Sequence, residues 1–456
     1  MKGLYPRRPH LVVLLHVLCL IALIAAANLL ATHAIAQSGD SAQAADALSG
    51  SPPAETIWTR KQLLGDIGGA RSWLGDHGVS VDLKLSQYYQ DVVSGGVDNG
   101  GEYGAVMDYI VNVNGEKVGL WKDLFLNIKT QTQFGNYDSF YDRTGSFAFA
   151  NSQLLYPLPG STRSAITAWT ITQFFNEDVM VYGGKLNTFD LLNIFFPFQK
   201  SGTAGFFNTN LYAPALPWFR FIELSEFGGG IQKNGPLGLE YGLIVYDPTN
   251  RSTTDSDTYD DLFEDVAGIA YYRHYFDVGD KPAKLTFAVG SSSASYTSLE
   301  PTVWDPSGPG VSEPGFETGS ESGAYAITGY YEQILWQAGP KAERNILLFT
   351  GMTIGSNNPG FAEWSGFGTV EFTGYFPSRP KDRIGVGGFY NNLASGLKDA
   401  TGLIGDSLQD TSGVEFYYNA ELTPWLHITA NLQLVNSATR DTNTSVIPGI
   451  RTVIDF

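Results

Sequence analysis

The sequence predicts an all-β protein: a 16-stranded antiparallel transmembrane β-barrel with short periplasmic turns, long external loops and an inward-folded constriction loop. Three observations predict it. Apolar and polar residues alternate over long stretches, for example in residues 79–86 and 237–246. Every second connection between these stretches is short. The chain ends on Phe456, after a strand whose two faces differ in polarity.

The composition excludes helical membrane proteins and argues against an ordinary soluble domain. Only 16% of the residues are charged, against about 25% in typical soluble domains. The mean hydropathy is nevertheless −0.09, and beyond the N-terminus no segment approaches the roughly 20 apolar residues of a membrane helix. In a membrane β-barrel one face of each strand is apolar and the other is polar, so apolar and polar residues alternate and the mean hydropathy stays near zero.

The N-terminus indicates export. Basic residues (Lys2, Arg7 and Arg8) precede an apolar run over residues 11–30, and Ala34 and Ala36 frame a small-residue cleavage site. We expect a signal peptide over 1–36, the alternative being an uncleaved anchor helix. A flexible periplasmic tail over 37–60, a short segment with a helical turn over 61–78 and the barrel over 79–456 then follow. Cys19, the only cysteine, leaves with the signal peptide, so thiol chemistry is excluded.

The charge of the mature chain excludes nucleic-acid binding. Removal of the three leading bases leaves 25 bases against 46 acids, a net charge of −21. Phosphate backbones require a cationic surface. The partners expected are instead outer-membrane lipid, lipopolysaccharide and the solutes of a channel.

Sixteen strands are expected, and their connections have a parity. After the first strand, which starts at Val79, the patterns predict strands near 102–113, 123–133, 164–175, 178–187, 218–232, 237–246, 265–276, 284–297, 323–336, 345–356, 363–376, 383–393, 412–422, 425–437 and 447–456. Long links near 134–163, 188–217, 248–264, 298–322 and 394–411 fall on one side, and short turns fall on the other. A barrel inserted from the periplasm has this asymmetry, whereas a soluble β-sandwich gives no reason for it.

One long link is too apolar for an external loop. The link over 188–217 contains Leu191, Asn193, Phe195, Asn208 and Tyr212, and exposing such a segment to water would be costly. We therefore expect it to fold into the barrel and narrow the pore.

Residues 64–83 resemble the start of the carbohydrate-selective outer-membrane porins of the OprB type. Asp66, Gly68, Gly69 and Arg71 precede the Gly78–Val79 pair and the first strand, with Ile67 where the family has Trp. Further similar stretches are residues 169–186, Phe207–Asn208 with Pro214, and 449–456. The resemblance implies a porin for passive, carbohydrate-selective diffusion of small polar solutes, with monosaccharides or small saccharides as solutes.

Four positions depart from the family pattern and put the sugar preference in doubt. Thr167 and Ile171 stand where relatives carry acids on the fourth strand, Tyr182 stands where they carry Arg, and Lys185 stands where an amide is expected. The resemblance thus implies a different channel polarity from that of glucose-selective relatives.

A channel needs hydrogen-bonding side chains along a water-filled constriction and sites weak enough to release the solute. Strand parity and proximity to the apolar link nominate ten channel-lining or constriction residues: Lys84, Lys129, Gln131, Gln173, Lys185, Asn193, Arg220, Glu223, Glu240 and Arg451. For each of them, a wall ion pair without a role in selection is the alternative.

The links 248–264 and 298–322 contain ten acids and one base, Arg251, which predicts an acidic vestibule that favours neutral or cationic solutes. The run from Asp255 to Asp261 lacks the Gly and the final Glu of a calcium-binding EF-hand loop, so no metal is expected. Nor is a cofactor expected. Catalytic motifs are missing, and Ser395 with Lys398 matches a nucleophile spacing only by chance.

The sequence therefore predicts an integral protein of the outer membrane of a Gram-negative bacterium, a passive channel rather than an enzyme, as a monomer or homotrimer. A general or cation-preferring porin without sugar selectivity is the first alternative. An outer-membrane enzyme or adhesin with a plugged lumen, and a secreted soluble β-protein, are the others.

Overall fold

The computed structural model describes residues 55–135, 138–145, 150–151, 153, 164–195, 203–248, 262–305, 315–339, 343–403 and 408–456. The chain divides into two compact units, 1–60 and 61–456. The signal peptide expected over 1–36, and the expected tail as far as residue 54, lie outside the described residues. The second unit contains every strand.

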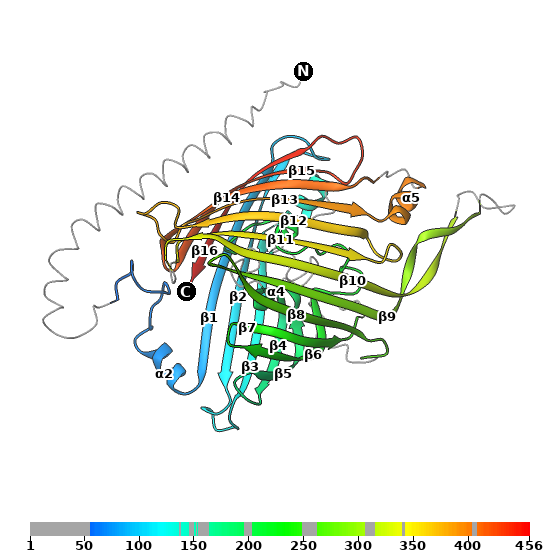
Figure 1. Cartoon of the computed structure of the whole chain (residues 1–456). Helices are drawn as coiled ribbons and strands as arrows, with labels where there is room; N and C mark the ends of the chain where they lie inside the picture. The colour runs from blue at the N-terminus through cyan, green and yellow to red at the C-terminus, as the bar shows by residue number, and fades with distance from the viewer. Residues whose placement is uncertain are drawn as a thin grey trace, which may run out of the picture. The chain divides into compact units, whose positions relative to one another are not determined.

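Sixteen antiparallel strands close into one barrel, which confirms the predicted fold class (Figure 1). Each strand pairs with its neighbours in sequence, and β1 closes the barrel against β16. The strands are β1 Val79–Val92, β2 Gly100–Asn114, β3 Leu124–Gly135, β4 Ser164–Phe174, β5 Val179–Asn187, β6 Ser225–Gly235, β7 Gly238–Tyr246, β8 Ala267–Val278, β9 Lys281–Asp305, β10 Gly315–Gln337, β11 Asn345–Gly355, β12 Ala362–Thr373, β13 Arg383–Leu393, β14 Thr411–Thr423, β15 Leu426–Asn436 and β16 Ser445–Asp455.

The closing seam explains the form of the C-terminus. In β16, Arg451 and Val453 are buried inside, while the residues between and beside them face outward by alternation. The Phe456 amide donates to the Leu83 carbonyl, and Arg71 donates to the Phe456 carbonyl at 2.8 Å. The last residue is thus bonded to the first strand and to the segment before it.

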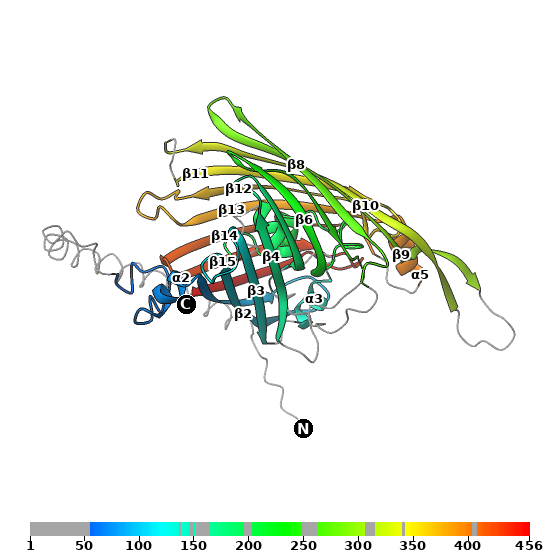
Figure 2. The same ribbon diagram turned by 90° about the horizontal axis from the view of Figure 1, so that it is seen from below.

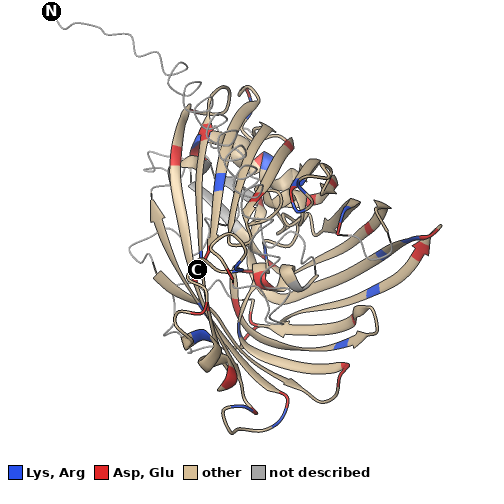
Figure 3. Cartoon of the chain, turned by 90° about the vertical axis from the view of Figure 1, so that its left-hand side faces the viewer, with Lys and Arg blue, Asp and Glu red and all other residues tan. Residues whose placement is uncertain are grey.

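The wall has an apolar outer face and a polar inner face. Apolar side chains are exposed on the outside along many strands, among them Ile231, Leu243, Phe287, Ile327, Met352 and Phe416. Figure 3 shows long stretches of strand without charged residues. The strand positions that alternate with these carry buried polar groups such as Gln131, Glu371 and Glu415. An apolar exterior around a polar interior is the arrangement of a barrel in a bilayer.

Two strand predictions need correction. The stretch 218–232 was expected to be one strand, but β6 begins at Ser225, because the side chains of Trp218 and Phe221 are buried within the lumen instead of alternating across a sheet. Much of the expected link 298–322 is paired as strand, since Asp305 is in register with Gly315. Figure 2 shows β9 and β10 extending past the neighbouring strands.

Helices are short and lie at strand ends. Among the residues that the structure describes, they are α2 Ala70–Asp76, α3 Asp138–Thr144, α4 Thr188–Phe195 and α5 Ser395–Leu403, with the 3-10 turn η3 at Thr209–Leu211. Over the described ranges, none of the helices has both the length and the apolar character needed to cross a bilayer. In α5, Lys398 pairs with Asp410 at 2.8 Å, which accounts for that lysine structurally.

Candidate channel constriction

The connection between β5 and β6, residues 188–224, is here termed the lumen loop; its residues 196–202 are outside the described part. It begins with α4, whose N-terminus is capped by Asn187. The Asn187 Oδ1 atom accepts from the amides of Phe189 and Asp190, at 3.0 and 3.1 Å. Asn at this position satisfies amides that the first helical turn leaves free. The helix therefore starts as soon as β5 ends, and Figure 1 shows it among the strands.

The middle of the lumen loop is bound to the inner face of β14, β15 and β16. Both carboxylate oxygens of Glu415 accept loop amides, from Phe207 at 2.7 Å and Asn208 at 2.9 Å. The Asn208 side chain donates to Gln433 at 3.2 Å, and Arg451 donates to the Gly205 carbonyl at 3.0 Å. Because these partners sit on inward positions of distant strands, the loop crosses the barrel interior.

Apolar packing holds the same segment. The loop side chains Phe206, Phe207 and Leu211 are fully buried in a cluster with Phe349 and Phe389 of the wall. The part of the loop that follows η3, residues 212–224, is here termed the return limb. On it, the Trp218 Nε1 atom donates to the Thr328 hydroxyl at 2.7 Å. Burying one large apolar side chain contributes about 1.5–3 kcal/mol. The loop is therefore anchored as firmly as a protein core.

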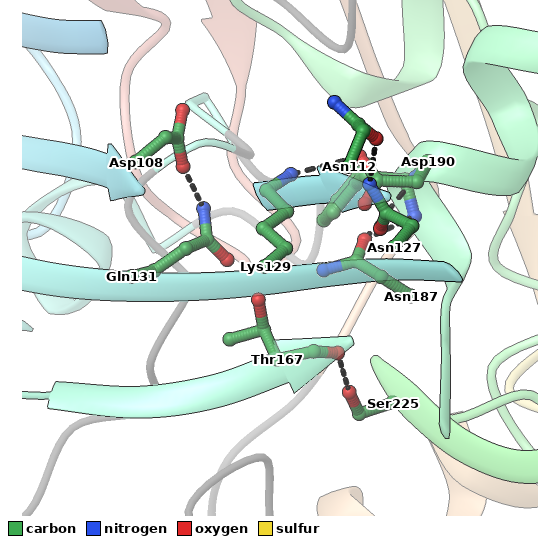
Figure 4. Close-up of polar contacts among 10 residues, drawn as sticks. Asp108, Asn112, Asn127, Lys129, Gln131, Thr167, Asn187, Asp190 and Ser225 are labelled. Atoms are coloured by element: carbon green, nitrogen blue, oxygen red, sulfur yellow. Dashed lines mark hydrogen bonds and ion pairs between the residues drawn. The ribbon is translucent and has the colours of Figure 1, made fainter. Parts of the chain in front are cut away.

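A polar pocket of about 330 Å³ lies between α4 and strands β2 to β5 (Figure 4). The ammonium group of Lys129 lies 2.8 Å from the Asp190 carboxylate at its edge. Its polar lining is Asn127, Lys129, Thr170, Thr172, Asn187 and Asp190, and its apolar lining includes Met180 and the ring of Tyr182.

Hydrogen bonds preorganise part of this polar wall. Asn127 donates to Asn112 at 2.6 Å, and Gln131 donates to Asp108 at 2.6 Å. The Asn187 Nδ2 atom is buried and has no hydrogen-bond partner among the residues described. Since an unmade buried hydrogen bond costs about 1–3 kcal/mol, this amide is available to a solute or to water.

The structure brings five of the ten predicted residues to the lumen loop. Lys129 pairs with Asp190 of α4, Arg451 binds the loop carbonyl at Gly205, and Asn193, Arg220 and Glu223 belong to the loop itself. Gln131 is inward and buried beside Asp108.

Two predicted residues make ion pairs with the neighbouring strand of the wall. Lys84 lies 3.7 Å from Asp455 across the closing seam. Glu240, just after the turn between β6 and β7, lies 3.8 Å from Lys233.

Gln173 and Lys185 do not face the lumen, which corrects their nomination. Gln173 is in register with the exposed Val181, accepts from the indole of Trp121 at 2.6 Å and donates to the Lys122 carbonyl. Lys185 alternates with Leu186, which packs inside, so its side chain points to the opposite face of β5.

The register of the strands also changes the interpretation of the positions that depart from the family pattern. Ile171 is 47% exposed on the outer face, so an acid missing there is not missing from the channel. Tyr182 does face inward, where it lines the polar pocket. Thr167 is buried, and its carbonyl accepts from Ser225 (Figure 4).

Sequence reasoning missed a set of buried charged residues on the inner wall. Arg383 lies 2.8 Å from Glu371, Lys284 lies 3.0 Å from Glu332, and Arg273 donates to the Phe195 carbonyl at 2.8 Å. The available signal was a charged residue at an inward position of a strand, which parity alone could have identified.

Two charged groups of the return limb have displaced pKa values. Burial raises the pKa of the Glu223 carboxyl to about 7, against a smaller lowering effect of Arg220. Burial also lowers the pKa of Arg220, whose guanidinium donates to the Thr297 carbonyl at 2.7 Å and lies over the rings of Tyr296 and Phe361. The limb thus contains an acid that changes charge near neutral pH.

Only part of the expected acidic vestibule can be located. Glu264, Glu300 and Glu321 are exposed. The stretch 255–261, Arg251 and Glu313 are outside the described residues, as are the side chains of Asp305 and Glu317. Within the described part of the chain, no group of three or more His, Cys, Asp or Glu side chains is placed to hold a metal ion.

A closed barrel of sixteen strands with an apolar exterior, a polar interior and a loop bound inside it is the architecture of an outer-membrane porin. Residues 252–456 match the model of the family described as carbohydrate-selective porin, OprB family, which confirms the resemblance over this part of the chain. The stretch 64–83, which resembles the start of the family's barrels, precedes the matched range.

Solved structures agree on the fold. The high-pH structure of Pseudomonas putida OprB is similar with a TM-score of 0.73 at 17% identity, covering 88% of this chain and 100% of that chain. The low-pH structure of the same protein gives a TM-score of 0.54 at 14% identity, covering 88% and 99%. No curated protein sequence matches the chain.

Proposed function

We propose that this porin passes small neutral polar solutes, above all monosaccharides and small saccharides, along the polar pocket beside the lumen loop. The observation that carries the proposal is the polar lining of this pocket, which has four side-chain amides or hydroxyls and two charged groups of opposite sign. The two charges, Lys129 and Asp190, neutralise one another at 2.8 Å. A wall of this kind offers hydrogen bonds without a net charge.

Sugars suit such a wall for two reasons. Their hydroxyls both donate and accept, as do the amides of Asn127 and Asn187 and the hydroxyls of Thr170 and Thr172. The apolar face of a sugar ring can lie on the inward ring of Tyr182. Sites of this type bind weakly enough to release the solute, which transport requires.

Single-channel conductance of the refolded protein in a planar bilayer, titrated with glucose and larger saccharides, tests the proposal. We expect a steady conductance that a sugar blocks saturably. A conductance that no saccharide alters would contradict sugar selectivity and leave a general porin. The absence of open-channel current would contradict the channel itself.

A cation-preferring porin is the second candidate, favoured by the exposed acids Glu264, Glu300 and Glu321. An acidic entrance concentrates cations within about a Debye length. The reversal potential in a KCl gradient separates the two candidates. A strong cation preference that disappears when the three acids are changed to Gln would support this candidate, and a potential near zero would exclude it.

The outer face of the barrel indicates which molecules surround the protein in the membrane. We infer that the exposed apolar band is in contact with outer-membrane lipid, and that the rim of the external loops is in contact with lipopolysaccharide, in a monomer or a homotrimer. Exposed apolar side chains such as Phe287 and Met352 would be costly in water, which supports the lipid contact. Mass measurement of the detergent-solubilised protein would separate the two oligomeric states.

A further inference from the structure

A second cavity, of about 120 Å³, lies behind the lumen loop. It is enclosed by α4, by the return limb of the loop and by the inner face of strands β6 to β10. The walls are almost entirely apolar, with Leu192, Phe195, Ile244 and Ala288 among the lining residues. A cavity of roughly 150 Å³ in a protein core holds one benzene molecule, so this smaller cavity has room only for a compact hydrocarbon group smaller than benzene.

One side of this rear cavity is polar and only partly satisfied. Glu223, Glu226 and Tyr246 all line it. The Tyr246 hydroxyl is wholly buried and has no hydrogen-bond partner among the described residues. One oxygen of Glu226 accepts the Glu223 amide at 2.8 Å. An orphaned hydroxyl beside two carboxyl groups, all facing an apolar space, is costly unless a ligand or water completes it.

The Glu223 carboxyl has no fixed counter-ion. Within the described residues no base lies within ion-pair distance of it, and the nearby Arg220 donates to the Thr297 carbonyl. The charged or titratable groups around it are Arg220 on the same limb, Glu226 on β6, Tyr246 on β7 and Tyr296 on β9. Three of these four neighbours carry no positive charge.

We propose that the rear cavity binds a small organic ammonium ion with a compact hydrocarbon body of about four carbon atoms, smaller than benzene. The hydrocarbon group fills the apolar part, and the ammonium group donates N–H hydrogen bonds to Glu223, Glu226 and the Tyr246 oxygen. An alcohol of equal size donates a single hydrogen bond and would leave the other acceptors unmatched. The Glu223 carboxyl must be ionised to hold the ammonium ion, and its pKa of about 7 makes the binding pH-dependent.

Calorimetry on the full mature protein in detergent, with isobutylammonium chloride and isobutanol as probes, tests this site. We expect saturable binding of isobutylammonium at pH 8, roughly thirtyfold weaker binding at pH 5.5 where Glu223 is protonated, and at least tenfold weaker binding of the alcohol at pH 8. Equal binding of the two probes, or no binding of the amine, would overturn the proposal.

Two variants locate the binding. Glu223→Gln should reduce amine binding about tenfold and remove its pH dependence, while Ala288→Leu should block both probes by filling the cavity. Glu116→Gln, at an exposed position in the turn between β2 and β3, is the matched control and should leave binding unchanged. Folded barrels are verified by their heat-modifiable migration on gels. Amine binding that survives Ala288→Leu, or that falls equally in the control, would contradict the site.

Discussion

The Nζ atom of Lys129 on β3 lies 2.8 Å from Oδ1 of Asp190 on α4. This ion pair joins the barrel wall to the first turn of the lumen loop at the edge of the polar pocket. Its lysine side chain is only 12% exposed, so the pair is better shielded from salt than a surface pair. The position of the loop and the chemistry of the pocket therefore depend on the same contact.

Replacing Lys129 by Met should weaken sugar block without closing the channel. The change removes a hydrogen-bond donor from the pocket and leaves Asp190 without its counter-ion. The loss of one net hydrogen bond, about 1 kcal/mol, corresponds to roughly a fivefold rise in the half-blocking sugar concentration. Current block by glucose measures it. Lys122→Met, at a 76% exposed turn position, is the control, and an equal effect of both variants would refute the assignment.

Replacing Glu415 by Ala should release the middle of the lumen loop. The amides of Phe207 and Asn208 would lose their acceptor in a buried setting. We expect greater open-channel current noise and passage of larger saccharides, measured by single-channel recording and liposome swelling. Glu421→Ala, whose partner Lys381 is half exposed, is the matched control. Unchanged noise in Glu415→Ala would show that apolar packing alone holds the loop.

Adding one methyl group at Gly387 should destabilise the barrel, whereas the same change at Gly388 should not. A Cβ atom at Gly387 would meet Thr369 Cγ2 at 2.6 Å and Leu211 Cδ2 of the lumen loop at 3.1 Å. At Gly388 the nearest atoms are at 3.5 Å, an ordinary contact. Overpacking costs about 1–3 kcal/mol. Urea unfolding in lipid vesicles should separate Gly387→Ala from Gly388→Ala, and equal midpoints would mean that the loop moves freely.

Arg383 and Glu371 should be strongly coupled. The pair is buried at 2.8 Å, and the Tyr417 hydroxyl also donates to Glu371. Removing one partner leaves a buried charge, at a cost of about 3–5 kcal/mol. Arg383→Met should therefore destabilise the barrel more than the double variant Arg383→Met, Glu371→Gln does. A double-mutant cycle on unfolding free energies measures the coupling, and additive effects would rule it out.

Glu223 should make stability pH-dependent between about pH 4.5 and 7. Its pKa in the folded protein is raised from 4.5 to about 7, so the folded state binds the proton more tightly than the unfolded state does. The stabilisation is fully present below pH 4.5 and is lost as the pH rises through 7. Melting temperatures of wild type and Glu223→Gln across this range test it. A constant difference between the two proteins would contradict the shift.

Strand parity predicted much of the wall and of the inward set. Alternation placed Lys129, Gln131 and Arg451 on the inner face correctly, because a strand with one face in lipid tolerates few charges on that face. Gln173 and Lys185 are nominated by the family resemblance and by their nearness to the apolar link, not by alternation. A shift of one residue reverses both faces of a strand, so such a nomination does not determine which face a side chain takes.

The candidate site itself was harder to predict. The return limb around Trp218 and Phe221 reads as a strand because buried loop residues are as apolar as a lipid-facing wall. The partnership of Glu415 with the amides of Phe207 and Asn208 joins positions more than two hundred residues apart. No local pattern encodes a contact of that separation.

The alternation of the sequence by itself determined that this chain forms a barrel of sixteen strands with an apolar exterior. Every strand in a membrane must pair its backbone groups with its neighbours and must present an apolar face to lipid, so each strand carries the pattern in its own residues. Only the tertiary structure decided which inward groups meet. The lumen loop pairs Asp190 with Lys129, covers the inner wall at Glu415 and leaves the two cavities on either side of α4. Those contacts depend on the path of one loop through the lumen, which is fixed by packing and long-range hydrogen bonds rather than by residue periodicity.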